Sequence, residues 1–240
     1  MQRVLSKNEI PGEKRLNNTR SVTAFSQAAA RLSFAGAAVF LILLAALHVV
    51  KPEFNPSWRF VSEYAIGRHG WIMVVAFISL AFSCLTSVIA IRSQIETMGG
   101  RIGLALLLVV AATLILAGVF VADPIMVTQD ELTTHGTIHG LAATIGIPGL
   151  PIAAVLISHS LVRKPGWSSA RRSLLFTAHL TWVTVLGMFV SMFIMLGRNQ
   201  GKFGPEVLIG WPNRLVVLAY CLWLMVVAWQ VVKKDREANS

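Results

Sequence analysis

The stretch Trp71–Ile91 reads WIMVVAFISLAFSCLTSVIAI and contains no Asp, Glu, Lys or Arg. As an α-helix, a run of about 20 apolar residues is long enough to cross the hydrocarbon core of a bilayer. Uncharged runs of similar length occur at Leu32–Val50, Ile102–Ala122, Ile138–Val162, Ser173–Gly197 and Leu215–Val232. We therefore expect an all-α integral membrane protein, built as a bundle of six transmembrane helices.

The composition leaves little room for a soluble domain beside these spans. Of the 240 residues, 55% are hydrophobic and 13% are charged, whereas soluble domains carry about 25% charged residues. We predict a single membrane domain over residues 31–233. A disordered basic tail over residues 1–30 precedes it, and a short tail over residues 234–240 follows it.

The basic residues are sorted onto alternate loops. If the N-terminus is cytoplasmic, the inside segments are 1–31, 92–101, 163–172 and 233–240, which contain 15 Lys and Arg against five Asp and Glu. The outside loops contain six of each, so the whole net charge of +10 lies inside, as the positive-inside rule requires. This predicts a multi-pass protein of the cell (inner) membrane with both termini cytoplasmic. It favours membrane lipids as partners and gives no reason to expect nucleic acid binding.

The first outside loop, Lys51–Gly70, reads KPEFNPSWRFVSEYAIGRHG. Its prolines end the first span, and the aromatic residues of Ser57–Ile66 lie mostly on one side of a helix. We predict a short helix in the membrane interface, with its Trp and Tyr at headgroup depth. Arg59 and Glu63 lie four residues apart on the other side, within reach of an ion pair.

The fourth span contains Pro148 and Pro151. Because proline has no amide hydrogen, neither residue can donate to the carbonyl four residues earlier. We expect a kink or a broken helix near the bilayer centre. Such breaks mark substrate sites in transporters; a kink that serves packing alone is the alternative.

Four polar residues at the outer ends of the spans could form a metal site. His135 and His139 are four apart and project from one helical face. His48 and Asp123 could complete the three or four ligands that zinc prefers. Zinc with an open position would activate water, which would make the protein a metal-assisted hydrolase or transferase at the membrane interface, with these same four residues as candidate catalytic groups. In the alternative, they bond loop carboxylates and backbone.

Haem is a less favourable cofactor than zinc. A dihaem electron carrier would pair His48 with His139 and His159 with His179. His139 and His159 are separated by about 30 Å of helix, which is nearly the whole hydrocarbon thickness. Both haems would therefore lie at the edges of the membrane.

Several short motifs resemble one family when they are taken together and in order. They are Pro52-Glu53-Phe54-Asn55-Pro56, Arg59-Phe60-Val61-Ser62-Glu63-Tyr64, Asp123-Pro124, His135-Gly136-x-x-His139-Gly140 and Gly210-Trp211-Pro212-Asn213-Arg214. Over roughly Arg31 to Lys233, the sequence resembles the prokaryotic membrane family known as domain of unknown function 998. The resemblance implies a six-helix bacterial or archaeal membrane protein, and it brings no established activity and no catalytic residue.

The distinctive polar residues lie on the outer side of the predicted topology, so we place any functional site there. The leading hypothesis is a membrane protein that binds, and in the metal-dependent variant processes, a lipid or another amphiphile at the outer leaflet. Arg59, Arg198 and Arg214 would hold an anionic headgroup, and Glu63 would orient Arg59. The alternatives are a non-enzymatic transporter or permease subunit that uses the fourth span, and an accessory subunit without a site.

Overall fold

The computed structural model describes the backbone of residues 11–239 and the side chains of residues 24–164 and 166–234. Within this part of the chain every element is helical. The long helices are α1 (Pro11–Val50), α2 (Trp71–Ile91), α3 (Met98–Val119), α4 (Thr134–Leu161), α5 (Arg171–Arg198) and α6 (Gly210–Asn239). Short 3-10 helices are η1 (Val61–Ala65), η2 (Arg92–Gln94), η3 (Gln129–Glu131) and η4 (Pro165–Ala170).

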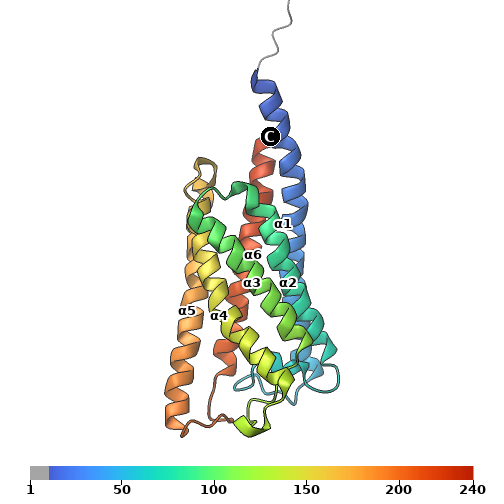
Figure 1. Cartoon of the computed structure of the whole chain (residues 1–240), viewed down its shortest axis with the longest axis vertical. Coiled ribbons are helices and arrows are strands. Elements are labelled where there is room, and N and C mark those ends of the chain that lie inside the picture. Colours follow the sequence, from blue (N-terminus) through green and yellow to red (C-terminus); the bar gives the residue numbers. More distant parts are fainter. Residues whose placement is uncertain (1–10, 240) are drawn as a thin grey trace, which may run out of the picture.

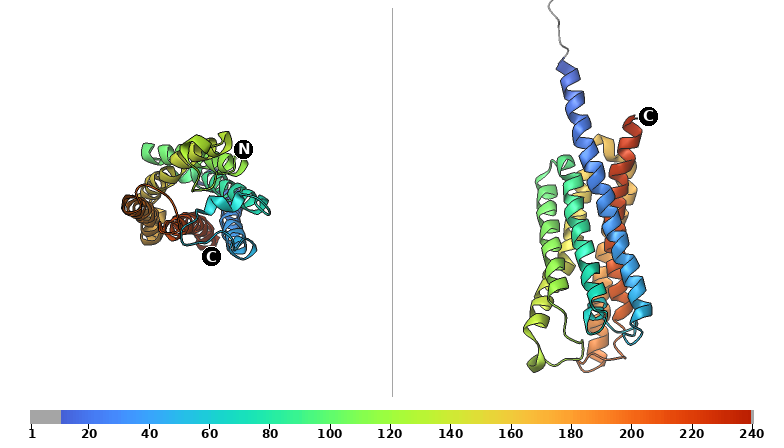
Figure 2. Two further views of the ribbon diagram at one scale, coloured as in Figure 1. Left: turned by 90° about the horizontal axis from the view of Figure 1, so that it is seen from below. Right: turned by 90° about the vertical axis from the view of Figure 1, so that its right-hand side faces the viewer.

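The six long helices run side by side along the long axis of the molecule (Figure 1). Each contains a segment that is long and apolar enough to cross a membrane, which confirms the predicted six-span bundle. Every helix packs against the next one in sequence, and α6 packs against α1, so the bundle closes into a ring (Figure 2). Large apolar side chains such as Phe193, which is 82% exposed, cover its outer surface, as contact with lipid requires.

The two ends of the bundle differ in their connections. The loops over residues 51–70, 120–133 and 199–209 lie together at one end, which we call the long-loop end (Figure 1). The short connections 92–97 and 162–170 lie at the opposite end, together with the terminal turns of α1 and α6. Connections that alternate between the two ends are typical of an up-and-down helix bundle, in which each helix runs antiparallel to the next.

The ends of some helices differ from the predicted ones. α2 has the predicted bounds, whereas α1 already begins at Pro11 and so covers residues 11–30 of the stretch predicted as a disordered tail. The first 10 residues of that stretch lie outside the described residues. α6 likewise continues to Asn239, through most of the predicted C-terminal tail.

The sequence predicts a kink or a break in α4, and the break is absent. The helix is continuous over Thr134–Leu161, with Pro148 and Pro151 inside it. Pro151 leaves the carbonyl of Ile147 without its backbone donor, and the hydroxyl of Tyr220 on α6 donates to that carbonyl. A side chain from a neighbouring helix therefore replaces the missing backbone hydrogen bond, which is how proline is tolerated inside a membrane helix.

Toward the end opposite the long loops, buried polar side chains form hydrogen bonds between pairs of helices. The hydroxyls of Ser33 on α1 and Ser83 on α2 lie 3.3 Å apart, and each also donates to the other residue's carbonyl. Trp223 on α6 donates to Ser158 on α4 across 3.1 Å. These contacts and the fully buried Trp223 connect the helices in this half of the bundle.

Candidate functional site: a cavity beneath the long loops

The first long loop folds back onto the end of the bundle. The helix predicted over Ser57–Ile66 is present only as η1, Val61–Ala65, and Glu63 and Tyr64 in it are buried. Tyr64 is fully buried, and its hydroxyl donates inward to the carbonyl of Phe54, 3.3 Å away. The loop thus forms a cover over the helix ends.

Arg214 on α6 holds this cover in place. Its side chain is only 4% exposed, and each of its three nitrogens donates within the protein. Nε donates to Nε2 of His48 (2.8 Å), Nη1 to the carbonyls of Arg59 (2.8 Å) and Gly210 (3.0 Å), and Nη2 to the hydroxyl of Tyr64 (3.1 Å). The GWPNR motif therefore anchors the RFVSEY motif.

His48 links α1 to the same cluster. Because its Nε2 accepts from Arg214, its hydrogen resides on Nδ1, which lies 2.7 Å from the carbonyl of Leu44. Its ring also contacts Tyr64, with the ring centroids 5.2 Å apart. Both ring nitrogens are thus committed, and neither is left for a metal ion.

Glu63 ties the first long loop to the second. Arg59 and Glu63 form the ion pair that their spacing predicts, at 3.0 Å. The Glu63 carboxylate, 1% exposed, also accepts from the amides of Phe60 (2.9 Å) and Ile125 (2.8 Å). Burial raises the pKa of the Glu63 carboxyl, although the amide of Ile125 and the charge of Arg59 act in the opposite direction.

Lys51 is a structural residue that the sequence did not indicate, since a loop lysine is usually solvated. It is 1% exposed. Its Nζ donates to the carbonyls of Tyr64 (3.1 Å) and Ile66, and lies 4.4 Å from the centre of the Phe54 ring. Burial lowers the pKa of Lys51, while the nearby Glu53 raises it.

Asp123 holds Thr133, the N-cap residue of α4. Its carboxylate accepts from the amide (2.8 Å) and the hydroxyl (2.9 Å) of Thr133, and the Thr133 hydroxyl accepts from the amide of Gly136 (3.0 Å). A Cβ atom on Gly136 would lie 1.9 Å from Oδ2 of Asp123. The glycine of the HGxxHG motif therefore leaves room for a carboxylate at the positive end of the helix.

His139 faces the end of α3. Its Nδ1 lies 2.9 Å from the carbonyl of Phe120 and 3.1 Å from that of Ala117. Since both partners are acceptors, Nδ1 carries the hydrogen and Nε2 keeps a free lone pair. His135, one turn earlier, is exposed and contacts only the ring of Phe120, with the centroids 5.2 Å apart.

The four candidate metal ligands therefore have separate partners. Among the side chains that the structure describes, no three His, Cys, Asp or Glu lie close enough together to hold a metal ion. Of the two histidine pairs considered for haem, His159 and His179 do meet, with ring centroids 6.0 Å apart. His48 is instead bonded to Arg214.

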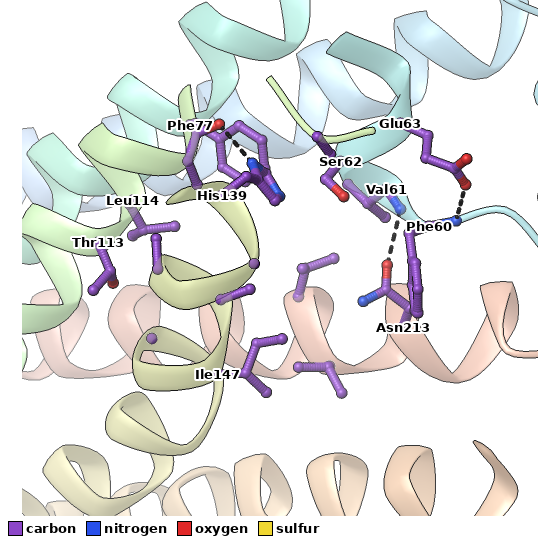
Figure 3. Close-up of a pocket in the computed structure, with 18 of the residues that line it drawn as sticks. Phe60, Val61, Ser62, Glu63, Phe77, Thr113, Leu114, His139, Ile147 and Asn213 are labelled. Atoms are coloured by element: carbon purple, nitrogen blue, oxygen red, sulfur yellow. Dashed lines mark hydrogen bonds between the residues drawn. The ribbon is translucent and has the colours of Figure 1, made fainter. Parts of the chain in front are cut away.

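A cavity of about 490 Å³ lies beneath the long loops, between η1 and the halves of the helices nearest to these loops. Its walls come from α1, α2, α3, α4 and α6, with Phe203 from the third long loop, and most of them are apolar. In Figure 3, Ser62, His139 and Asn213 lie near the loop end of the cavity, and Ile147 lies farther from the loops. The polar lining residues are Ser62, Glu63, Thr113, Asp123, His139, Asn213 and Tyr220.

The arginines predicted to bind a headgroup do not line this cavity. Arg214 donates only to groups of the protein interior. Arg59 pairs with Glu63, and its guanidinium carbon lies 5.0 Å from the centroid of the Phe54 ring and 4.7 Å from that of the Trp58 ring. Arg198 is exposed at the end of α5. Among the described residues, no Lys or Arg lines the cavity wall.

The fold and this cavity define a multi-pass, six-helix membrane protein. The family described as "Protein of unknown function (DUF998)" matches residues 34–230, so the chain belongs to that family. Comparisons with curated proteins and with solved structures give no match. Family membership confirms the resemblance seen in the sequence and assigns no reaction.

Proposed function

We propose that this protein binds a lipid or another amphiphile in the cavity at its long-loop end. The observation that carries the proposal is the cavity itself. Its volume of about 490 Å³ falls in the range of small-molecule sites, and such sites combine apolar walls with a few polar groups. The cavity opens at its edge, where the lining residues Pro124, Leu132 and Gly140 are exposed, so a ligand can enter it.

The distribution of the lining residues suggests how an amphiphile would lie. Phe40, Leu80 and Leu150 supply apolar wall at the level of the helices. Ser62 and Asn213 supply polar groups beside η1, near the loops. An apolar chain would therefore extend along the helices, with its polar end beneath the loop cover.

We propose further that the long-loop end faces away from the cytoplasm, in the cell (inner) membrane. The excess of basic residues on the opposite side supports this orientation. In intact cells, a membrane-impermeant maleimide should label Gln129→Cys at the long-loop end and not Ser93→Cys at the other end; both positions are exposed. The reverse labelling would contradict the orientation.

A substitution that fills the cavity tests binding. Gly140 lines the cavity, and a Cβ there would meet no atom within 4 Å. Because Gly140 is exposed at the edge of the cavity, the side chain of Gly140→Phe should enter the cavity or cover its mouth, and its Cβ displaces no neighbour. Gly187 on α5 also has no neighbour within 4 Å and does not line the cavity, so Gly187→Phe is the matched control.

The measurement is native mass spectrometry of the three proteins after mild detergent extraction. We expect a co-purifying amphiphile on the wild type and on Gly187→Phe, and at least a several-fold lower occupancy on Gly140→Phe. Equal occupancy of all three proteins, or no amphiphile on any of them, would contradict the proposal.

Transport is a second candidate, favoured by one observation. Gly146, Ile147 and Leu150, which flank Pro148 on α4, line the cavity, and proline-containing helices beside a cavity occur at transporter substrate sites. A transporter would move a fluorescent lipid between the leaflets of proteoliposomes faster than protein-free vesicles do. A rate equal to that of protein-free vesicles would rule out transport of this lipid and leave binding as the proposed function.

A further inference from the structure

We infer that the polar end of the bound amphiphile is an uncharged hydroxyl group, which donates to Nε2 of His139 and accepts from the hydroxyl of Ser62. This inference rests on the proposed function and names the class of ligand: a long-chain alcohol or another amphiphile with a hydroxyl at its polar end. It replaces the anionic headgroup expected from the sequence.

The charges around the cavity exclude an anionic headgroup. Two carboxylates, Glu63 and Asp123, line the wall, and no described Lys or Arg does. Arg214, the arginine of the GWPNR motif, is bonded to His48 and to the carbonyl of Arg59 instead. A phosphate or carboxylate in this cavity would lack a cationic partner, and a buried unpaired charge is strongly unfavourable.

A cationic headgroup finds no free partner either. Both oxygens of Glu63 accept backbone amides, and one of them also pairs with Arg59. Both oxygens of Asp123 accept from Thr133. The two carboxylates are thus already engaged by the protein, which leaves an uncharged polar group as the best match.

His139 determines the direction of the hydrogen bond to the ligand. The carbonyls of Ala117 and Phe120 fix the hydrogen on Nδ1, so Nε2 can only accept. In Figure 3 this second ring nitrogen is turned away from α3, toward the side of the cavity where Ser62 lies. A ligand at this position must therefore be a hydrogen-bond donor.

The other polar groups of the wall fit a hydroxyl. Thr113 donates to the carbonyl of Val110 (2.8 Å) and Tyr220 donates to that of Ile147, so both hydroxyls already use their hydrogens. The Ser62 hydroxyl points into the cavity (Figure 3) and can donate to a ligand oxygen. A group that donates to His139 and accepts from Ser62 has the pattern of an alcohol.

Photoaffinity labelling with competition tests this assignment. The probe is a long-chain alcohol with a diazirine in its chain, added to the protein in lipid nanodiscs, and the labelled peptides are identified by mass spectrometry. The competitors are dodecanol, dodecyl methyl ether, dodecyl phosphate and dodecyltrimethylammonium. We expect dodecanol to compete about fivefold better than the ether, the effect of roughly one hydrogen bond, and better than either charged competitor.

Two variants assign the effect to the named atoms. His139→Leu should remove the preference for dodecanol over the ether. Ser62→Ala, which leaves the contacts between α3 and α4 unchanged, should weaken competition by dodecanol and by the ether alike, because both oxygens can accept from the Ser62 hydroxyl. Ser79→Ala is the matched control, because Ser79 bonds its own helix at the carbonyl of Val75 and lies outside the cavity; its preference should equal that of the wild type.

The outcomes separate this inference from the proposed function. Labelling of cavity peptides that alcohol and ether reduce equally, or that a charged competitor reduces most, would overturn the hydroxyl assignment and leave amphiphile binding intact. Labelling that misses α4 and η1, or that is unchanged in Gly140→Phe, would overturn both.

Discussion

Nε of Arg214 donates a 2.8 Å hydrogen bond to Nε2 of His48, which joins the last and first helices across 166 residues of sequence. The same guanidinium holds the first long loop through the carbonyl of Arg59 and the hydroxyl of Tyr64. Since that loop roofs the cavity, its position depends on a buried arginine that never touches the cavity space.

Replacing this arginine should destabilise the protein strongly. Arg214→Met keeps much of the side-chain volume and removes the donors to His48, Arg59, Gly210 and Tyr64. We expect the free energy of unfolding to fall by roughly 3 kcal/mol or more, because buried acceptors lose their partners. Thermal unfolding in detergent measures the change. Arg198→Met, at an exposed position, should behave like the wild type; equal effects of the two variants would argue against the anchoring role.

Glu63 should make stability depend on pH. Burial raises the pKa of its carboxyl above the ordinary value of 4.5, so the folded protein binds this proton more tightly than the unfolded chain does. The resulting stabilisation is present below pH 4.5 and is lost as the pH rises through the raised pKa. Melting temperatures from pH 4 to pH 8 should therefore show a decline in the wild type that is smaller in Glu63→Gln.

The comparison of slopes isolates this carboxyl from other titrating groups. Glu63→Gln should also melt at a lower temperature throughout, because an amide has one acceptor oxygen for the two amides of Phe60 and Ile125. Parallel pH profiles for the two proteins would show that the Glu63 carboxyl does not have a raised pKa.

Tyr220 and Pro151 should be energetically coupled. Tyr220→Phe leaves the carbonyl of Ile147 without a donor, and we expect it to lower the free energy of unfolding by about 1–3 kcal/mol. In a Pro151→Ala background the residue at 151 regains an amide that can donate to Ile147, so the same change should cost less. A double-mutant cycle from denaturant titrations gives the coupling. Strictly additive effects would show that the Tyr220 hydroxyl does not replace the missing amide of residue 151.

Two glycines one turn apart on α4 should respond differently to the same change. Gly136→Ala places a methyl group 1.9 Å from Oδ2 of Asp123, so it should displace the cap and lower the free energy of unfolding by about 1–3 kcal/mol. Gly140→Ala meets no atom within 4 Å and should raise helix stability by up to about 1 kcal/mol. Thermal unfolding of both variants checks this; similar destabilisation by the two alanines would refute the close contact at Gly136.

The parts of the structure that follow from local sequence were predictable. The uncharged run Trp71–Ile91 coincides with α2, since the thickness of a bilayer sets the length of a span. Arg59 and Glu63 form their ion pair because it depends only on a spacing of four residues. The six spans followed in the same way from hydropathy and length.

The candidate site depends on contacts between distant segments, which a single sequence does not encode in any local pattern. The engagement of His48 by Arg214 and the bond between Tyr220 and Ile147 connect residues 166 and 73 positions apart. Without these contacts, the sequence alone gives His48 as a candidate metal ligand and predicts a kink or a break in α4 at its prolines. The cavity likewise results from how five helices and three loops meet, and no single motif marks it.

The central claim is that an amphiphile occupies the cavity beneath the long loops. A cryo-electron microscopy map of the wild-type protein, extracted from its own membrane into nanodiscs without added detergent, tests it most directly. We predict elongated density between Leu150 and His139, with its polar end beside His139 and Ser62. A well-resolved map in which the cavity is collapsed, or open and free of such density, would contradict the account.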